Sequence, residues 1–367
     1  MKKTNSKILI LSIVTSVMLM SIISTGCGNE KNSTSTKQEN STSSTRKIID
    51  GTSKTVTIPY EVTRIAASGA LNQIVLILGG ADKLVATAQG VQTGFFPKVY
   101  PRITEIPAAY TGSGPGTLNM ETLLKANSQV VFGTFTQTEQ ERLQKANIAF
   151  LGLKLETPED IKNTITMVGK VLGESGEEKA KKFNEYYDNN IKYVSNKTKS
   201  SKKFKVFVAS GTPKGSLTTI GSNDINTSYI EAAGGINIAS ENISKESSTS
   251  NEGTSVDFEF LYKNQPDVII ATSKNTYDYI MDTSSSNQWQ SLTAVKNKQV
   301  YLNPKGVYLW SVRSAEGALQ PLWLAKNLHP DLFNDLDIRE KVKEFYKNYY
   351  YYDPSDNDLE DILNPKK

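Results

Sequence analysis

Two residue types that often carry chemistry occur once each in this chain of 367 residues, cysteine at Cys27 and histidine at His329. A single cysteine excludes an intrachain disulfide and a cluster of thiolate metal ligands. A single histidine excludes a multi-histidine metal site and disfavours catalysis that depends on histidine, and we expect His329 to be structural. The chain also contains no Gly-x-Ser-x-Gly elbow of a serine hydrolase. We therefore expect a protein that is not an enzyme, with no catalytic residues, no protein-held metal and no intrinsic cofactor.

Cys27 follows an N-terminal sequence that is typical of secretion. A short basic start is followed by an apolar run that ends near Ser24, as in a signal peptide. The sequence Ser24-Thr25-Gly26-Cys27 resembles a bacterial lipobox, in which the cysteine receives acyl chains such as palmitate, although leucine is more usual than Ser24. We therefore predict a signal peptide over residues 1–26, a lipidated Cys27 and a location at the outer face of the cell membrane. An uncleaved membrane anchor and an incidental cysteine are the alternatives.

Residues 27–47 are expected to be the lipidated cysteine and a flexible tether. From Gly28 to Arg46 the chain has no aliphatic or aromatic side chain, so this segment cannot bury apolar surface to offset its ordering entropy. Removal of the three lysines in the signal peptide lowers the formal net charge from +4 to +1. Because the mature chain has no polybasic stripe, we exclude nucleic acid as a partner.

Beyond the tether, segments typical of strands alternate with segments typical of helices, in two series. Strands are expected at 63–67, 84–88, 129–132 and 148–153, and in the second series at 204–209, 267–271 and 299–302. Helices are expected at 71–78, 121–126 and 138–146, and in the second series at 227–233, 258–263, 314–328 and 345–352. Pro321 implies a kink or break within 314–328. This alternation indicates a parallel sheet with helices on its faces in each series.

One long helix is expected between the two series. Apolar residues recur there at spacings of 3, 4, 4 and 3, at Ala180, Phe183, Tyr187, Ile191 and Val194. These spacings place one apolar stripe along a helix. The sequence therefore predicts an α/β fold of two lobes with central sheets, at residues 48–173 and 201–367, joined by a long α-helix over 174–200. The second lobe includes the C-terminal helices.

The candidate ligand contacts follow from this arrangement, because ligands of open parallel α/β sheets bind outside the carboxyl ends of the strands. The loops expected there are 89–96, 110–116 and 134–137 in the first lobe, and 210–216, 272–277 and 308–313 in the second. Arg313 can hold a carboxylate or an anionic chelate, and Tyr308 and Trp310 offer flat aromatic faces. Alternatively, Arg313 pairs with Glu316 and Trp310 fills the core. Weaker candidates, each with a structural alternative, are Tyr110, Tyr229, Tyr277 and Lys214.

Several segments carry a family resemblance through their order and spacing. They are Arg64-Ile65-Ala66 with 78–85 (LGGADKLV), 118–124 (LNMETLL), 256–261 (VDFEFL), 266–270 (PDVII), and 323–326 (WLAK) with 328–331 (LHPD). Together they cover about residues 50 to 352 and resemble the substrate-binding lipoproteins of ABC importers for iron complexes and cobalamin. Residues 126–128 (ANS) depart from the Lys-Pro-Asp that usually precedes the strand in the first lobe.

The resemblance implies a ligand cleft between the lobes and only a small closure around a rigid linking helix. It also implies that one glutamate on each lobe, Glu121 and Glu259, docks into arginines of a permease dimer. Carboxylate–guanidinium pairs are bidentate and directional, which suits recognition of a symmetric dimer. The alternative is that each glutamate only complements the dipole of its own helix. The expected partners are an ABC permease dimer with its ATPase subunits and a small molecule, with the chain itself a monomer.

The implied function is capture of a metal chelate, with a ferric siderophore as the leading ligand, and its delivery to the permease. A body rich in aromatic residues and with one histidine suits a ligand that brings its own metal coordination. A cobalamin or corrinoid receptor and a haem receptor are alternatives on the same scaffold. A sensor that binds without transport and an extracytoplasmic hydrolase that uses only carboxylates are alternatives of other classes.

Overall fold

The computed structural model describes residues 44–112, 114–211, 217–240, 253–283 and 288–366. The predicted signal peptide, Cys27, most of the tether and Lys214 lie outside the described residues. Ser43–Lys367 form one compact unit. Across the described ranges, no helix combines the length and the apolar character needed to cross a bilayer.

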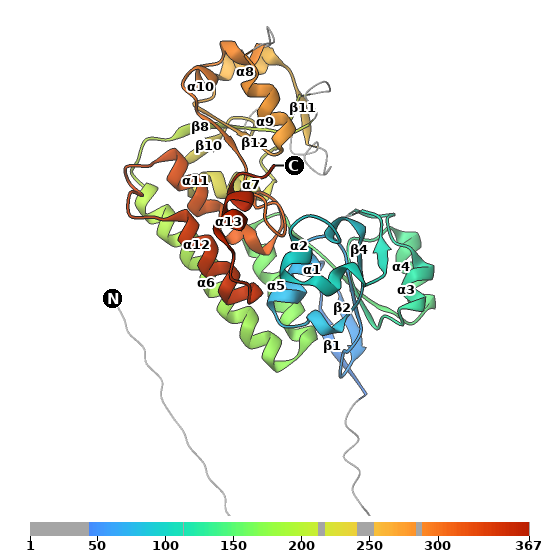
Figure 1. The fold of residues 1–367 in the computed structure, drawn as a ribbon. Coiled ribbons are helices and arrows are strands. Elements are labelled where there is room, and N and C mark those ends of the chain that lie inside the picture. Colours follow the sequence, from blue (N-terminus) through green and yellow to red (C-terminus); the bar gives the residue numbers. More distant parts are fainter. Residues whose placement is uncertain (1–43, 113, 212–216, 241–252, 284–287, 367) are drawn as a thin grey trace, which may run out of the picture. The chain divides into compact units, whose positions relative to one another are not determined.

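The first lobe is built on a parallel sheet in the strand order β5-β4-β3-β6-β7 (Figure 1). Central β3 pairs with β4 and β6, and all residues of β3 and β6 are buried, as expected where helices cover both faces of a parallel sheet. The strands are β3 Ile65–Ala67, β4 Leu84–Ala88, β5 Ala108–Tyr110, β6 Val130–Gly133 and β7 Ala149–Gly152. The helices are α1 Leu71–Ile77, α2 Phe96–Val99, α3 Met120–Lys125 and α4 Gln137–Lys145.

The second lobe repeats this plan with a parallel sheet in the order β10-β8-β12-β13. Its strands are β8 Phe204–Ala209, β10 Gly235–Asn237, β12 Val268–Ala271 and β13 Val300–Leu302, with a separate antiparallel pair of β9 Leu217–Thr219 and β11 Thr254–Val256. Its helices are α7 Ile225–Ala232, α8 Phe258–Asn264, α9 Lys274–Met281, α10 Thr293–Lys296 and α11 Gln320–Leu328. The predicted helix over 314–328 is broken into the 3-10 turn Ala315–Ala318 and α11, because Pro321 lies in the first turn of α11.

The long helix α6, Glu174–Thr198, confirms the linking helix and runs beside elements of both lobes (Figure 1). It packs on α5, Pro158–Leu172, in the first lobe and on α7 and α11 in the second. Four residues of the predicted stripe are buried and Ile191 packs against the same core. The crossing with α5 is close, since a Cβ on Gly169 would lie 2.8 Å from the Gly176 carbonyl oxygen.

An N-terminal hairpin, β1 Thr45–Ile49 with β2 Thr55–Pro59, was missed by the sequence analysis. It overlaps the end of the range expected for the tether. Arg46 donates to the carbonyl oxygens of Lys170 (2.7 Å) and Val171 (2.9 Å) at the end of α5. The Asp50 carboxylate accepts the Gly152 N–H at 2.9 Å, which joins the hairpin to β7. Hydrogen bonds to the lobe, rather than apolar burial alone, thus order this segment.

The C-terminal segment consists of α12 Ile338–Phe345, a π-helical turn Tyr346–Tyr350 and α13 Asp356–Leu363. The helix predicted at 345–352 therefore begins earlier and ends in the π turn. Although this segment follows the second lobe in sequence, it contacts the first lobe. Lys98 and Asp358 form an ion pair at 2.6 Å, and the Phe95 ring lies 5.7 Å from the Tyr346 ring.

Candidate ligand-binding site

The loop from Asn303 to Ser314, which follows β13, carries three of the predicted ligand residues. The buried carboxylate of Glu316 holds the backbone of this loop through hydrogen bonds. Glu316 accepts the backbone N–H groups of Val307 at 3.2 Å and Tyr308 at 2.7 Å, together with the Tyr346 hydroxyl. The Ser314 hydroxyl caps the following turn by accepting the Gly317 N–H at 3.1 Å. The loop is therefore held by a buried network rather than by surface contacts.

Glu316 is fully buried, and burial raises the pKa of its carboxyl to about 7 even though its hydrogen-bond donors act to lower it. The sequence left open that Glu316 forms an ion pair with Arg313. Instead, the Glu316 carboxylate accepts hydrogen bonds from the loop backbone and from the Tyr346 hydroxyl. Glu316 is thus a residue that positions the loop 303–314, the predicted ligand loop.

Arg313 lies where the two lobes meet. Its Nε donates to the carbonyl oxygen of Leu155 at 2.8 Å, in the first-lobe segment between β7 and α5. The Arg313 charge also interacts electrostatically with Asp224, the N-cap residue of α7 in the second lobe. Burial raises the pKa of the Asp224 carboxyl, while the Asn226 N–H and the Arg313 charge lower it in part. The structure therefore places one half-buried guanidinium against groups from both lobes.

Trp310 and Tyr308 have different environments although they share the loop with Arg313. Trp310 is fully buried in the main hydrophobic core, where its indole N–H has no hydrogen-bond partner among the described residues. This is the position that its structural alternative predicts, and the ring presents no exposed face to a ligand. Tyr308 is half-buried and packs against the same core, so part of its ring remains accessible.

The tyrosine candidates outside this loop lie within the separate lobes. Tyr110 ends β5, is 2% exposed and donates to the Phe132 carbonyl oxygen at 3.3 Å. Burial raises the pKa of its phenol well above the usual value. Tyr277 on α9 packs against the core of the second lobe, and the Tyr229 hydroxyl contacts that of Tyr187 at 2.5 Å in the core. These placements favour structural roles.

His329 follows the last turn of α11 and also has structural contacts. Its ring lies 5.0 Å from the Phe204 ring, edge to face, and its Nε2 lies 3.4 Å from the Ser201 hydroxyl. Burial lowers the pKa of the imidazole. Within the described ranges, no three His, Cys, Asp or Glu side chains gather into a possible metal site.

The two predicted docking glutamates occupy the same position on helices of different lobes. Glu121 is the second residue of α3, and Glu259 is the second residue of α8. Both are exposed. In each helix the N-cap side chain accepts the N–H of the third residue, at 3.0 Å for Asn119 and 2.8 Å for Asp257. Glu121 also forms an ion pair with Lys125 at 2.7 Å, in which both side chains are 76% exposed.

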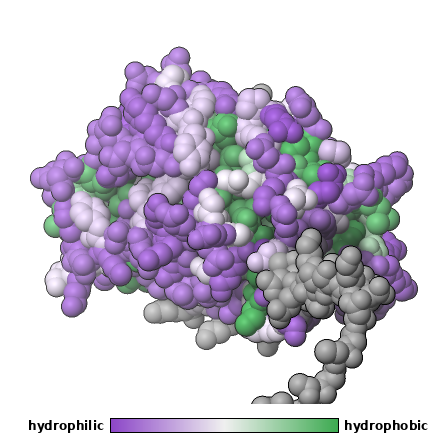
Figure 2. Space-filling view, turned by 90° about the horizontal axis from the view of Figure 1, so that it is seen from below, coloured by the Kyte–Doolittle hydropathy of each residue, from purple (hydrophilic) through white to green (hydrophobic). Residues whose placement is uncertain are grey.

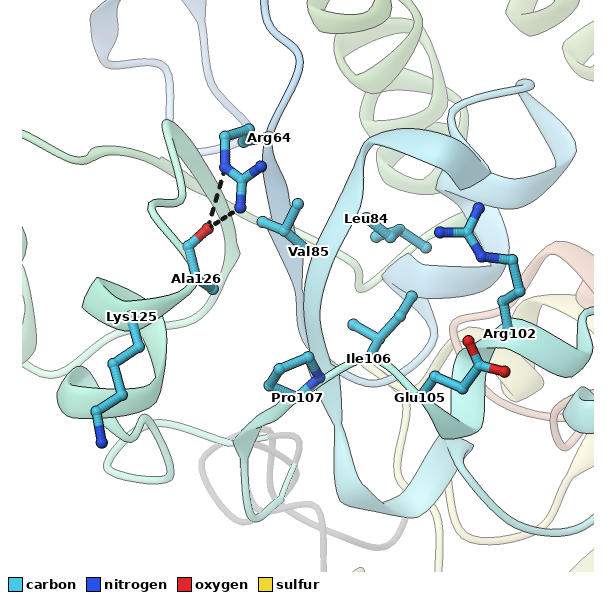
Figure 3. A pocket seen from close by; sticks show the side chains of 9 residues that line it. All are labelled: Arg64, Leu84, Val85, Arg102, Glu105, Ile106, Pro107, Lys125 and Ala126. Carbon is cyan, nitrogen blue, oxygen red and sulfur yellow. Dashed lines mark hydrogen bonds between the residues drawn. The ribbon is translucent and has the colours of Figure 1, made fainter.

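A cavity of about 360 Å³ lies on the first lobe, at the end of the sheet opposite the ligand loops (Figure 3). It is bordered by the amino ends of β3, β4 and β5, and it is lined by Arg64, Leu84, Val85, Arg102, Glu105, Ile106, Pro107, Lys125 and Ala126. The Arg64 guanidinium donates to the Ala126 carbonyl oxygen from Nε at 3.1 Å and from Nη2 at 2.6 Å. Arg64 therefore completes the end of α3, and the cavity is not at the predicted ligand position.

Sequence reasoning missed the residues that support Arg313. Gln73 on α1 is fully buried, accepts the Ala315 N–H at 2.7 Å and donates to the Tyr350 hydroxyl. A polar side chain on the buried face of an apolar helix was the available signal, because such groups need partners. Asp224 and Glu316 gave no comparable signal, since their burial depends on segments far away in the sequence.

Comparisons with known proteins agree with this architecture. The family profile described as Periplasmic binding protein matches residues 65–306. The Molybdate-binding protein MolA of Haemophilus influenzae is 24% identical over an alignment of 332 residues, and the match covers 83% of this chain and 91% of MolA. A periplasmic solute binding protein from Veillonella parvula superposes with a TM-score of 0.74 at 26% identity, over 87% of this chain and 97% of its own.

Two further solved structures share the fold at lower identity. MolA of Haemophilus influenzae bound to molybdate has a TM-score of 0.72 at 21% identity, over 84% of this chain and 99% of its own. Helicobacter pylori CeuE in its Ni-His complex has a TM-score of 0.69 at 21% identity, over 87% of this chain and 99% of its own. The match extends over both lobes in each case.

Proposed function

Because this chain belongs to the periplasmic binding protein family, we propose that it captures an anionic metal complex outside the cell and delivers it to the permease of an ABC importer. Its named relatives are transport binding proteins rather than enzymes. Membership of the family supports substrate binding for an ABC importer. The ligand class, the lipid anchor and the docking residues are our proposals.

Arg313 is the observation that carries the ligand class. Its guanidinium belongs to the second lobe but donates to the Leu155 carbonyl oxygen of the first lobe at 2.8 Å. A guanidinium offers several N–H donors in one plane, so an anion beside it gains directional hydrogen bonds as well as charge. Because the side chain is half-buried, solvent screens such an interaction less than on an open surface. These features support an anionic ligand at the junction of the lobes.

A ferric siderophore is the form of anionic complex that we expect, since an organic chelate supplies the metal ligands that this chain lacks in its described part. Molybdate is the second candidate, and the similarity to MolA over most of both chains favours it. Molybdate and the ferric complexes of catecholate or carboxylate chelators are anions, and each brings its metal already coordinated. Haem and corrinoids fit the same scaffold; haem also carries carboxylates that a guanidinium can bind, whereas corrinoids make less use of one.

We also propose that Cys27 carries a lipid anchor and that Glu121 and Glu259 dock the two lobes to the permease. The anchor rests on the lipobox-like sequence before Cys27. The docking assignment is supported by two exposed carboxylates at matching positions of α3 and α8. The permease with its ATPase subunits is accordingly the macromolecular partner.

Calorimetric titration of the full-length protein in detergent tests the ligand class. The panel holds ferric catecholates, ferric hydroxamates, ferric citrate, molybdate, haem and cobalamin. Calorimetry is preferred because the three tryptophans, Trp289, Trp310 and Trp323, are between 0% and 7% exposed and their fluorescence is a poor reporter. We expect one anionic class to bind at micromolar concentration or below. We expect Arg313→Ala to weaken that binding by about 10- to 100-fold through loss of a charge-assisted contact.

The matched control is Arg339→Ala, which removes an arginine that pairs with Asp356 at 3.2 Å on the surface; its affinity should equal that of the native chain. Arg313→Lys should fall between the two because it keeps the charge but loses the planar fork. Equal affinity of Arg313→Ala and the native chain, or binding confined to neutral ligands, would contradict the anionic ligand class.

A further inference from the structure

A seven-residue sequence element occurs once on each lobe. Its two copies are 119–125 (NMETLLK) and 257–263 (DFEFLYK). Each copy has an Asn or Asp at the first position, a glutamate at the third, a leucine at the fifth, a large apolar residue at the sixth and a lysine at the seventh. The copies form α3 with its cap and most of α8 with its cap.

The fifth position determines which side chains of the element face solvent. Leu123 and Leu261 are both fully buried, each in the core of its own lobe. Burying the same position rotates the two helices alike about their axes. The glutamate, two residues before, and the apolar residue, one after, therefore point outward in both copies, and residues three apart share one helix face.

The outward apolar residues are Leu124, which is 49% exposed, and Tyr262, which is 41% exposed. Only seven large apolar side chains are exposed in the described part of the chain, and two of them occupy this one position. The face seen in Figure 2 is largely hydrophilic, with apolar groups in separate areas between the polar ones. A lone exposed leucine needs no explanation, but the same exposure beside a glutamate on both lobes does.

From this repetition, and resting on the proposed function, we infer that Leu124 and Tyr262 form part of the contact with the permease. Each pairs with its glutamate, Glu121 or Glu259, to make one of two equivalent contact elements. Two equivalent elements on one chain fit a partner that has two equivalent copies of its own surface, as a dimer with two-fold symmetry does. Each copy of that surface is expected to offer a cation for the carboxylate and an apolar recess beside it.

The charge arrangement agrees with this partner. Glu121 is held by Lys125 in an ion pair that is 76% exposed on both sides. Exposed ion pairs contribute little to stability, so a guanidinium of the partner replaces the lysine without a large cost. The apolar residue beside the pair then excludes water from the new contact, which strengthens it. The glutamates thus orient the contact through directional hydrogen bonds, and Leu124 and Tyr262 add buried apolar surface to it.

The test measures binding of full-length protein to proteoliposomes that contain the permease with its ATPase subunits. We expect Leu124→Ala combined with Tyr262→Ala to bind about ten-fold or more weakly than the native chain, as truncated apolar anchors of interfaces do. The matched control combines Leu332→Ala with Tyr351→Ala, a leucine and a tyrosine that are 41% and 73% exposed elsewhere. This control should bind within about two-fold of the native chain.

Conservative variants separate a contact role from a folding effect. Leu124→Met with Tyr262→Phe keeps the apolar surface and should bind as the native chain does. All variants should keep native ligand affinity in calorimetry, because neither residue lies on the loop of Arg313. The single variants Leu124→Ala and Tyr262→Ala should lose similar fractions of the binding if the two elements are equivalent.

Each remaining outcome has a defined meaning. If the native chain binds, and Glu121→Ala with Glu259→Ala abolishes binding while the apolar variants bind normally, this inference is wrong and the docking proposal stands. If the native chain itself does not bind the proteoliposomes, the proposed function and this inference both fail. If the apolar variants instead abolish self-association in sedimentation, the occupant is a second copy of this chain and the permease assignment is wrong.

Discussion

At the scale of single residues, Glu316 explains how the ligand loop keeps its conformation. Its carboxylate accepts two backbone N–H groups of the loop and the Tyr346 hydroxyl, with no exposure to solvent. Charge-assisted hydrogen bonds of this kind are strong, but burial opposes ionisation. The balance raises the pKa of Glu316 to about 7, so its charge state changes within the physiological pH range.

We predict that Glu316 makes the stability of the fold depend on pH. A carboxyl whose pKa is about 7 in the folded protein and lower in the unfolded chain binds its proton more tightly when folded. Its contribution to the free energy of unfolding therefore falls by up to about 3 kcal/mol as pH rises from about 4.5 to about 7. Above about pH 7 this contribution is constant. Denaturant unfolding of the native chain and of Glu316→Gln at pH 5, 6, 7 and 8 measures this.

Glu316→Gln cannot titrate at this position. The free energy of unfolding of the native chain should therefore exceed that of this variant most at pH 5 and by less at pH 8. Glu340→Gln, at an exposed position of α12, is the control and should follow the native profile. A constant difference between the native chain and Glu316→Gln across this pH range would mean that Glu316 stays ionised throughout.

At the scale of elements, the crossing of α5 and α6 ties the linking helix to the first lobe. Gly169 and Gly176 lie so close that neither has room for a side chain, because a Cβ on Gly169 would be 2.8 Å from both the Ala180 Cβ and the Gly176 oxygen. Small residues at a crossing let two helix backbones approach, and the resulting close packing resists relative movement. We therefore expect this contact to stiffen the junction between the linking helix and the first lobe.

We predict that Gly169→Val destabilises the protein by about 1–3 kcal/mol, because the added methyl groups force α5 and α6 apart. Chemical denaturation measures the change, and calorimetry should show weaker ligand binding if the lobes shift. Asn163→Val, at an exposed position of the same helix, controls for the helix propensity of valine and should change stability by less than about 0.5 kcal/mol. Equal effects of the two variants would argue against a tight crossing.

At the scale of the whole molecule, the continuous helix α6 and several separate contacts join the lobes. Among these contacts are the Arg313–Leu155 hydrogen bond, the Lys98–Asp358 ion pair and the bonds of Gln73. Gln73 accepts the Ala315 N–H and donates to Tyr350, so the ligand loop, the C-terminal segment and α1 share one buried network. We therefore expect a change in the position of Arg313 to affect the packing of the C-terminal segment.

The tether adds a prediction about the location of the whole protein. We expect Cys27→Ser to release the chain from the membrane fraction into the medium with unchanged ligand affinity, because stable attachment requires acyl chains on the cysteine. Cell fractionation and intact mass measurement check both points. Ser24→Leu, which restores the usual lipobox residue, should remain attached. Retention of Cys27→Ser in the membrane would favour the uncleaved anchor.

The fold class, both lobes and the linking helix could be predicted from the sequence. Apolar strands such as Leu84–Ala88 and the stripe along α6 are local patterns, and burial imposes them wherever helices cover a parallel sheet. The edge strands β5 Ala108–Tyr110 and β10 Gly235–Asn237 were missed, because neither short segment has the flanking apolar run that marked the other strands. The hairpin β1–β2 was missed because its order depends on hydrogen bonds to α5 and β7.

In the candidate site, too, some features follow from local sequence and others only from the tertiary structure. The sequence by itself placed Arg313 in a loop after a strand, and Glu121 and Glu259 each in the first turn of a helix, because these are local features; their roles in binding and docking remain predictions. Only the tertiary structure decided that Trp310 is in the core, that Arg313 reaches Leu155, and that Glu316 holds the loop. The Arg313–Leu155 bond and the burial of Trp310 and Glu316 depend on segments distant in the chain, such as the Tyr346 hydroxyl that bonds Glu316, and no local pattern encodes that burial.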